Sequence, residues 1–157
     1  MPVEFSQETL KKVGAIVSRY PKKEAALLPV LRMAQEEFGY LSVEAIEYVA
    51  RLMELQPARV YGVVTFYTML NMKPIGRHHI QVCRTLSCVL TGSEKITAFL
   101  KKRLAIELGE TTPDGKFTLS EVECLAACGT GPMMQINDDY YESLTGEKVE
   151  EILRSLK

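Results

Sequence analysis

The sequence predicts an α/β protein made of two modules, a helical N-terminal module followed by a small α/β module. Apolar residues recur at intervals of three and four over residues 6–55, which is typical of amphipathic helices. Turn-forming residues then gather at 73–76, and beyond them strand-like and helix-like segments alternate. We therefore expect a helical module at 1–74 and an α/β module at 75–157.

The first two helices follow from apolar periodicity and from the residues that end them. One is predicted over residues 6–20, with Pro21 as its end. The next is predicted over 23–38, with Gly39 as its C-terminal stop. Pro29 breaks helical hydrogen bonding unless it lies in the first turn, so this helix either begins late or kinks.

Two further helices complete a predicted four-helix module. Ser42 is expected to cap a helix that runs to about Leu55, and Pro57 suits the first position of the next. The segment 60–67 is rich in strand-forming residues, but its apolar positions do not alternate, so helix is favoured over strand. Its aromatic residues are predicted mostly as core, although some could face a partner, because aromatics are enriched at interface centres. They are Tyr61, Phe66 and Tyr67.

The second module has the pattern of a small sheet covered by two helices. Its elements are predicted in the order strand, helix, strand, strand, helix. They are placed at 79–82, 93–108, 116–122, 133–137 and 147–156.

The composition is that of an ordinary globular protein and excludes several function classes. Hydrophobic residues make up 46% and charged residues 25% of the 157 positions, and the net charge of -1 provides no broad basic field for nucleic acid. Residues 1–9 lack the basic start and apolar stretch of a secretion signal. The longest apolar stretch, 60–70, is shorter than the roughly 20 residues of a spanning helix. We expect no direct membrane insertion and a location in the cytosol.

All four cysteines lie in the second module, in two close pairs. Cys83 and Cys88 are separated by four residues, Cys124 and Cys128 by three, and 35 residues lie between the pairs. Each pair begins where a predicted strand ends. Two neighbouring strands would therefore bring the four thiols to one end of the sheet, which suits a site with four ligands.

Thiolates are soft ligands that select zinc or iron-sulfur clusters. The loop lengths allow a structural zinc site, although zinc sites usually have shorter loops, and they fit a [2Fe-2S] cluster with one pair on each iron at least as well. In a reducing cytosol, disulfides and unconnected thiols are the weaker alternatives. No C-x-x-C pattern is present, which argues against dithiol exchange.

The neighbours of the cysteines are suited to a negatively charged cluster. A [2Fe-2S] centre with four thiolates carries a charge of about -2, which backbone N–H groups must offset. Gly92, Gly129 and Gly131 are expected to let the backbone approach closely, and Arg84 to add a positive charge.

Four segments, together with the C-x4-C pair, carry a resemblance to a known family. They are Ala-Gln-Glu-Glu-Phe-Gly-Tyr-Leu-Ser at 34–42, Val-Thr-Phe-Tyr-Thr-Met at 64–69, Glu-Cys-Leu-Ala-Ala-Cys at 123–128 and Gly-Pro-Met-Met-Gln-Ile-Asn at 131–137. In these segments the chain resembles the thioredoxin-like [2Fe-2S] subunit of NADH:quinone oxidoreductase, respiratory complex I. Relatives of that subunit occur in NAD-linked hydrogenases and formate dehydrogenases.

The resemblance implies a fold and a set of cluster ligands. It implies an N-terminal four-helix module that docks a partner, followed by a thioredoxin-like [2Fe-2S] ferredoxin domain. It assigns one [2Fe-2S] cluster to Cys83, Cys88, Cys124 and Cys128 and no catalytic residue to this chain. A cis bond before Pro132 is a further hypothesis, because thioredoxin-like folds often have a cis-proline before a central strand.

The resemblance also implies a role within a complex. The chain would be a one-electron carrier subunit of NADH:quinone oxidoreductase, with no complete active site of its own. A cluster cannot accept a hydride, so a partner flavoprotein subunit would bind FMN, NADH and a [4Fe-4S] cluster. The assembly would lie at the inner face of the cell membrane. A free ferredoxin, a zinc-stapled binding module, and a hydrogenase or formate dehydrogenase as the parent complex stay open as alternatives.

Overall fold

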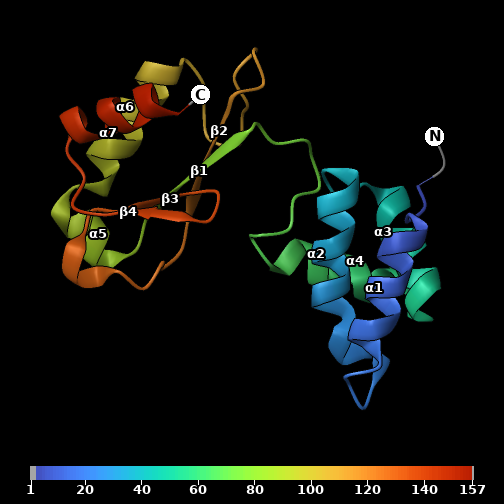
Figure 1. Cartoon of the computed structure of the whole chain (residues 1–157). Helices are drawn as coiled ribbons and strands as arrows, with labels where there is room; N and C mark the ends of the chain where they lie inside the picture. Colours follow the sequence, from blue (N-terminus) through green and yellow to red (C-terminus); the bar gives the residue numbers. More distant parts are fainter. Residues whose placement is uncertain (1–2, 157) are drawn as a thin grey trace. The chain divides into compact units, whose positions relative to one another are not determined.

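The computed structural model describes residues 3–156, which fold as two compact units, with the boundary along the chain between Pro74 and Ile75. Figure 1 shows the helical unit formed by the earlier part of the chain and the unit that contains the sheet. Each unit has its own hydrophobic core. No helix among residues 3–156 is long and apolar enough to cross a membrane.

The described residues of the first unit form four α-helices and one short 3-10 helix. Their bounds are α1 Gln7–Val17, η1 Lys23–Ala26, α2 Leu27–Phe38, α3 Val43–Met53 and α4 Pro57–Phe66. The Ser42 hydroxyl accepts a hydrogen bond from Ala45 N–H and caps α3 as predicted. Because α2 begins only at Leu27, Pro29 lies in its first turn, where a missing N–H costs nothing.

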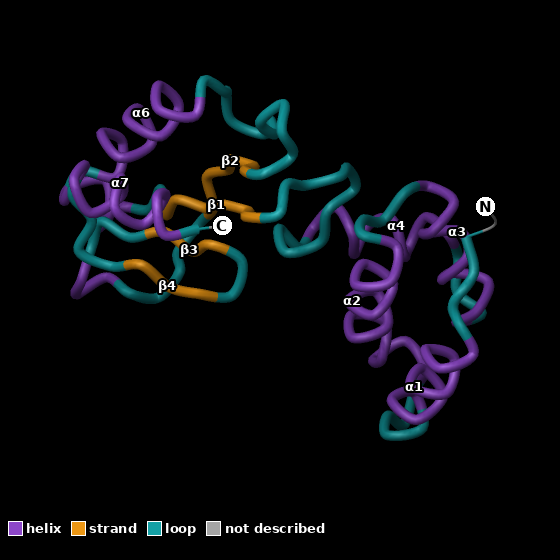
Figure 2. The backbone as a smooth tube through the Cα atoms, turned by 45° about the horizontal axis from the view of Figure 1, so that its top comes forward, coloured by secondary structure: helices purple, strands orange, loops and turns teal. Residues whose placement is uncertain are grey.

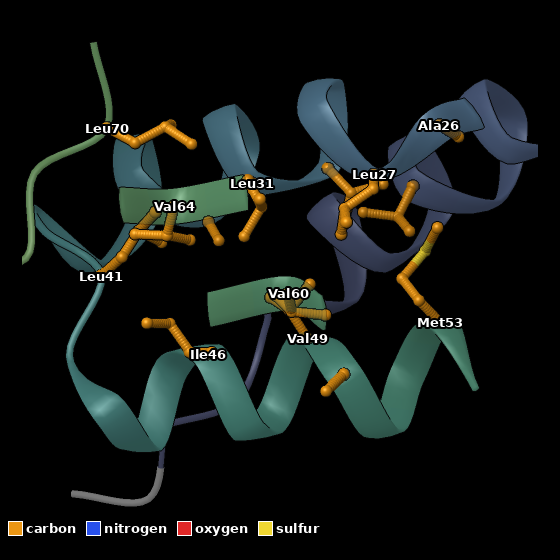
Figure 3. Close-up of a cluster of buried hydrophobic side chains, with 14 of the residues drawn as sticks. Ala26, Leu27, Leu31, Leu41, Ile46, Val49, Met53, Val60, Val64 and Leu70 are labelled. Atoms are coloured by element: carbon orange, nitrogen blue, oxygen red, sulfur yellow. The ribbon is translucent and has the colours of Figure 1, made fainter. Parts of the chain in front are cut away.

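Helices α2, α3 and α4 enclose the core of the first unit. Figure 3 shows Leu31 of α2, Val49 of α3 and Val60 of α4 directed into the same space between the helices. All three side chains are fully buried, and each such burial stabilises the fold by about 1.5–3 kcal/mol. The segment 60–67 is helical through Phe66, which confirms the preference for helix over strand.

The aromatic residues of α4 and the turn after it correct one prediction. Tyr61, Phe66 and Tyr67 were expected mostly in the core, but all three are exposed, and Phe66 keeps 76% of its surface. The apolar residues of α4 that enter the core are Val60 and Val64, which lie one helical turn apart. Tyr61 and Phe66 therefore lie outside the face of α4 that meets this core, and Tyr67 follows the end of the helix.

The second unit contains a four-stranded sheet and three α-helices within its described residues. Their bounds are β1 His78–Cys83, α5 Leu86–Thr91, α6 Ser93–Leu104, β2 Phe117–Val122, η2 Cys128–Thr130, β3 Met134–Ile136, β4 Asp139–Tyr141 and α7 Gly146–Ser155. The strand order is β2-β1-β3-β4, with β1 and β2 parallel and the other neighbours antiparallel. Figures 1 and 2 show α6 and α7 side by side over one face of this sheet.

Three features of the second unit differ from the prediction. Helix α5 and strand β4 were not predicted, and α6 ends at Leu104, before the predicted end at 108. Ala105 takes a left-handed conformation with φ of 54°, and this stops α6. Both missed elements are short, six and three residues, so neither extends far enough to show a periodic apolar pattern.

Candidate metal centre

The parallel pairing of β1 and β2 places the two cysteine loops at one edge of the sheet. Cys83 is the last residue of β1, and its register partner is Val122, the last residue of β2. Cys124 follows two residues after Val122. Strands that run parallel deliver their following loops to the same edge, so the predicted convergence of the two loops is confirmed.

The two pairs of cysteines differ in their environment. Cys83 and Cys88 are each 2% exposed and pack with Met133, and the partly buried Leu125 and Ala127 of the other loop pack against them. Helix α5 provides Cys88. Cys124 and Cys128 are exposed, and Cys128 begins η2. The site therefore has a buried side on β1 and α5 and an exposed side on the loop 124–130.

Hydrogen-bond donors surround the sulfur of Cys83. The Thr85 hydroxyl lies 3.2 Å from it, and the backbone N–H groups of Thr85 and Leu125 also point to it. Burial on its own raises the pKa of this thiol, but the donors around the sulfur outweigh burial and hold the pKa below its ordinary value. The surroundings of Cys83 thus favour a thiolate, the form that binds metal.

The pKa of the Cys88 thiol is shifted in the opposite direction, above its ordinary value. Burial raises the pKa of its thiol, and its contact with the Cys83 side chain raises it further, while the backbone N–H of Met133 lowers it. Negative charge on Cys128 also raises this pKa, so Cys128 of the second loop lies close enough to Cys88 to interact with it electrostatically. A positive ion between these sulfurs would remove their mutual repulsion.

The second loop curls around Cys124. Ala126 has φ of 61°, in the left-handed region that non-glycine residues rarely adopt. This conformation turns its backbone N–H toward Cys124, whose sulfur lies 3.3 Å from the nitrogen. Such backbone donors offset the negative charge of thiolates without adding a charged side chain.

Of the three glycines predicted to let the backbone approach closely, Gly131 alone lies against a cysteine. A Cβ atom there would stand 2.8 Å from Thr91 Oγ1 and 3.5 Å from Cys88 Sγ. Gly92 instead ends α5 in a left-handed conformation, and no atom lies within 4 Å of a Cβ at Gly92 or Gly129. The Gly131–Pro132 bond is cis, in agreement with the hypothesis.

Arg84 does not offer the free positive charge that the sequence indicated. Its guanidinium pairs with the Glu123 carboxylate, at 2.9 Å between Nη2 and Oε1, and both side chains are exposed. The pair ties together the two residues that follow β1 and β2, the strands that carry the cysteine loops. Its charges largely cancel, so backbone N–H groups must offset most of the charge of four thiolates.

The chemistry of the donor set fits a [2Fe-2S] cluster, which four thiolates hold. A cluster of two irons needs only two thiolates at each iron, and the chain provides one buried pair and one exposed pair. Four thiolates with N–H donors at Cys83, Cys88 and Cys124 match that requirement.

The histidines are not part of this site. His79 is 8% exposed, and its Nε2 lies 2.8 Å from Ser120 Oγ on the neighbouring strand. Burial lowers the pKa of its imidazole, so it is neutral at pH 7. His78 begins β1, five residues before Cys83 at the strand's other end, and its ring packs near Phe117.

The four cysteines were predicted as ligands from the sequence, but the Thr85 hydroxyl and the N–H donors at Leu125 and Ala126 were missed. Thr85 precedes α5, a position at which threonine usually caps the helix. Leu125 and Ala126 contribute backbone groups, which have no signature in the residue type. The missed donors therefore had no signal beyond their nearness to a cysteine in the chain.

Known proteins are similar to this chain over most of its length. The family model described as thioredoxin-like [2Fe-2S] ferredoxin matches residues 13–157. One subunit of the NADH-quinone oxidoreductase of Rickettsia felis is 50% identical over 152 residues, which cover 95% of this chain and 91% of that protein. The mitochondrial NADH dehydrogenase [ubiquinone] flavoprotein 2 of Dictyostelium discoideum is 46% identical over 159 residues, covering 99% of this chain and 64% of that protein.

One solved structure shares the fold. The crystal structure of an NAD+-reducing [NiFe]-hydrogenase in the air-oxidized state aligns with a TM-score of 0.72 at 19% identity. The alignment covers 83% of this chain and only 22% of that chain, so this chain spans about a fifth of the hydrogenase chain. The match over residues 13–157 and the 50% identity agree with the resemblance in the cysteine motifs. The chain belongs to the family of thioredoxin-like [2Fe-2S] ferredoxins.

Proposed function

We propose that Cys83, Cys88, Cys124 and Cys128 hold one [2Fe-2S] cluster and that the chain is a one-electron carrier subunit of an NADH-quinone oxidoreductase. The observation that carries this proposal is the meeting of two cysteine loops at the end of the parallel pair β1 and β2. Backbone N–H donors at three of the sulfurs support it. The family match and the relatives among NADH-quinone oxidoreductase subunits point to the same function.

The chain's own residues would serve the cluster in two ways. When bound, a [2Fe-2S] cluster supplies the transfer of single electrons. The packing of Met133 and Leu125 around Cys83 and Cys88 keeps water from one side of the site. The exposed loop 124–130 leaves the other side open, so electrons would enter and leave past Cys124 and Cys128.

A partner must supply the flavin. NADH gives up two electrons as a hydride, and a one-electron carrier cannot take them together. We propose a flavoprotein subunit that binds FMN and NADH as the partner, and exchange of electrons between its FMN and the cluster. The assembled complex would lie at the inner face of the cell membrane.

The helical unit, residues 1–74, is the proposed docking surface for this flavoprotein. Tyr61, Phe66 and Met69 lie on or just after α4 and are 46%, 76% and 49% exposed. Phe66 and Tyr67 lie side by side there, with 5.0 Å between their ring centroids, and adjoining exposed apolar side chains mark sites of protein contact. Aromatic residues and methionine are enriched in such interfaces, which supports a protein partner here.

Alanine substitutions at the cysteines test the ligand assignment. Replacement of Cys124 or Cys128 should abolish iron binding and the visible absorption of the purified chain, whereas Ser87→Ala, next to Cys88, should keep both. A variant that lacks one cysteine and retains full cluster absorption would exclude that residue as a ligand. Zinc without iron in the unaltered chain, prepared without oxygen, would favour the structural-module alternative.

Co-purification tests the docking proposal separately. Phe66→Ala should weaken retention of the flavoprotein at least tenfold, because buried aromatic side chains often dominate interface energies. Val43→Ala is the control, since Val43 is a 54% exposed apolar residue on α3. Equal retention by both variants would place the partner elsewhere.

A further inference from the structure

The Thr85 hydroxyl makes an unusual contact for a threonine that precedes a helix. Thr85 is the N-cap of α5, with extended backbone angles of -83° and 167°. A threonine there normally accepts a hydrogen bond from an N–H of the first turn, as Ser42 and Thr145 do at α3 and α7. The Thr85 side chain makes no such bond. Its hydroxyl instead lies 3.2 Å from Cys83 Sγ.

The direction of this hydrogen bond follows from the chemistry of a bound thiolate. In a free thiol either the sulfur or the hydroxyl can donate the hydrogen. A thiolate that binds iron has no proton, so only the Thr85 O–H can donate. The sulfur is buried, and a hydrogen bond to a charged acceptor is stronger in such surroundings than in water.

We propose that Thr85 is a positioning residue that sets the reduction potential of the cluster, through a hydrogen bond from its hydroxyl to the Cys83 sulfur. One-electron reduction adds a negative charge that the ligand sulfurs share. A donor at a sulfur stabilises this added charge, so it favours the reduced state and raises the potential. The inference rests on the proposed role of Cys83 as a ligand.

The size of the effect follows from the strength of one hydrogen bond. A hydrogen bond to a charged group contributes more than a neutral one, and only the difference between the oxidised and reduced states affects the potential. We expect that loss of the hydroxyl shifts the one-electron reduction equilibrium about tenfold toward the oxidised state. A tenfold shift corresponds to about 59 mV for one electron.

The test is a redox titration of the full chain with its cluster, followed by electron paramagnetic resonance. Thr85→Val keeps the shape of the side chain and removes the hydroxyl, so its potential should fall by the amount given above. Thr85→Ser keeps the hydroxyl and should restore the potential of the unaltered chain. Thr130→Val is the matched control, because the Thr130 hydroxyl donates to the Ala127 carbonyl and not to a sulfur.

Several results would overturn the proposal. One is an unchanged potential in Thr85→Val with the cluster intact. Another is a fall of the potential in Thr85→Ser and Thr130→Val that equals the fall in Thr85→Val. Thr85→Ala provides a second variant without the hydroxyl. If Thr85→Val and Thr85→Ala both lose the cluster while Thr85→Ser keeps it, the hydroxyl serves assembly and the proposal also fails. An unaltered chain that binds no iron would instead remove the proposed function itself.

Discussion

Replacement of Gly131 by alanine should destabilise the second unit through one contact. A Cβ at this position would stand 2.8 Å from Thr91 Oγ1, closer than real Cβ contacts, while its distances to Cys88, 3.5 Å to Sγ and 3.6 Å to Cα, are ordinary. The backbone of Gly131, with φ of -66°, suits any residue. The cost of the substitution therefore comes from Thr91 and not from backbone strain.

The magnitude depends on how freely Thr91 can move. Its hydroxyl donates to the backbone carbonyls of Ser87, at 2.9 Å, and Cys88, at 3.1 Å. Rotation of the side chain gives up these bonds, which contribute about 0.5–1.5 kcal/mol, and a shift of α5 disturbs packing at a cost of about 1–3 kcal/mol. The chain relaxes by the cheaper of these two routes, so we expect Gly131→Ala to lower the free energy of unfolding by about 0.5–1.5 kcal/mol.

Thermal unfolding, followed by circular dichroism at a fixed scan rate, measures this effect. For a chain of this size each kcal/mol lowers the midpoint by about 2–4 °C. Gly129→Ala is the control, because no atom lies within 4 Å of its added Cβ. In a Thr91→Ala background, which lacks this hydroxyl, Gly131→Ala should cost little further stability, because contacting residues are energetically coupled. Equal midpoints for Gly131→Ala and Gly129→Ala would refute the reasoning.

Two further predictions concern strand β1 and the residues just before it. Gly76→Ala should cost about 3 kcal/mol or more, because its Cβ would stand 2.9 Å from backbone atoms of Phe117, which cannot rotate away; Gly62→Ala, with no atom within 4 Å, should not lower the thermal midpoint. Burial lowers the pKa of His79 in the folded chain. As the pH falls below about 6.5, the unfolded chain therefore takes up a proton on this imidazole before the folded chain does. The contribution of neutral His79 to stability is thus complete above that pH and is lost as the pH falls toward the folded-state pKa. Between pH 7.5 and 5.5 the midpoint of the unaltered chain should fall more than that of His79→Gln, and parallel falls would contradict this.

Much of the fold follows from local signals in the sequence. Ser42 and Pro57 mark helix starts that the structure confirms, because capping and proline placement depend on a few neighbouring residues. The same holds for β1 and β2, whose buried apolar residues come just before the two cysteine pairs in the sequence. Helix α5 was not predictable in this way, since its six residues are too few to establish a helical period.

The sequence predicts the four cysteines as candidate ligands but does not predict the electrostatic environment of their sulfurs. The spacing of the cysteines and their places after two strands point to one edge of the sheet. The donor from Leu125 to Cys83 joins residues 42 positions apart, and it depends on how the loops fold. The exposed aromatics of α4 were misplaced for a related reason, because burial depends on which helix face meets the core.

The measurement that tests the central claim most directly is the visible and electron paramagnetic resonance spectrum of the purified chain, handled without oxygen, before and after dithionite. We expect two irons per chain, visible absorption that bleaches on reduction, and a spin-half signal that appears only in the reduced state. A colourless chain that contains zinc and no iron would contradict the proposed cluster.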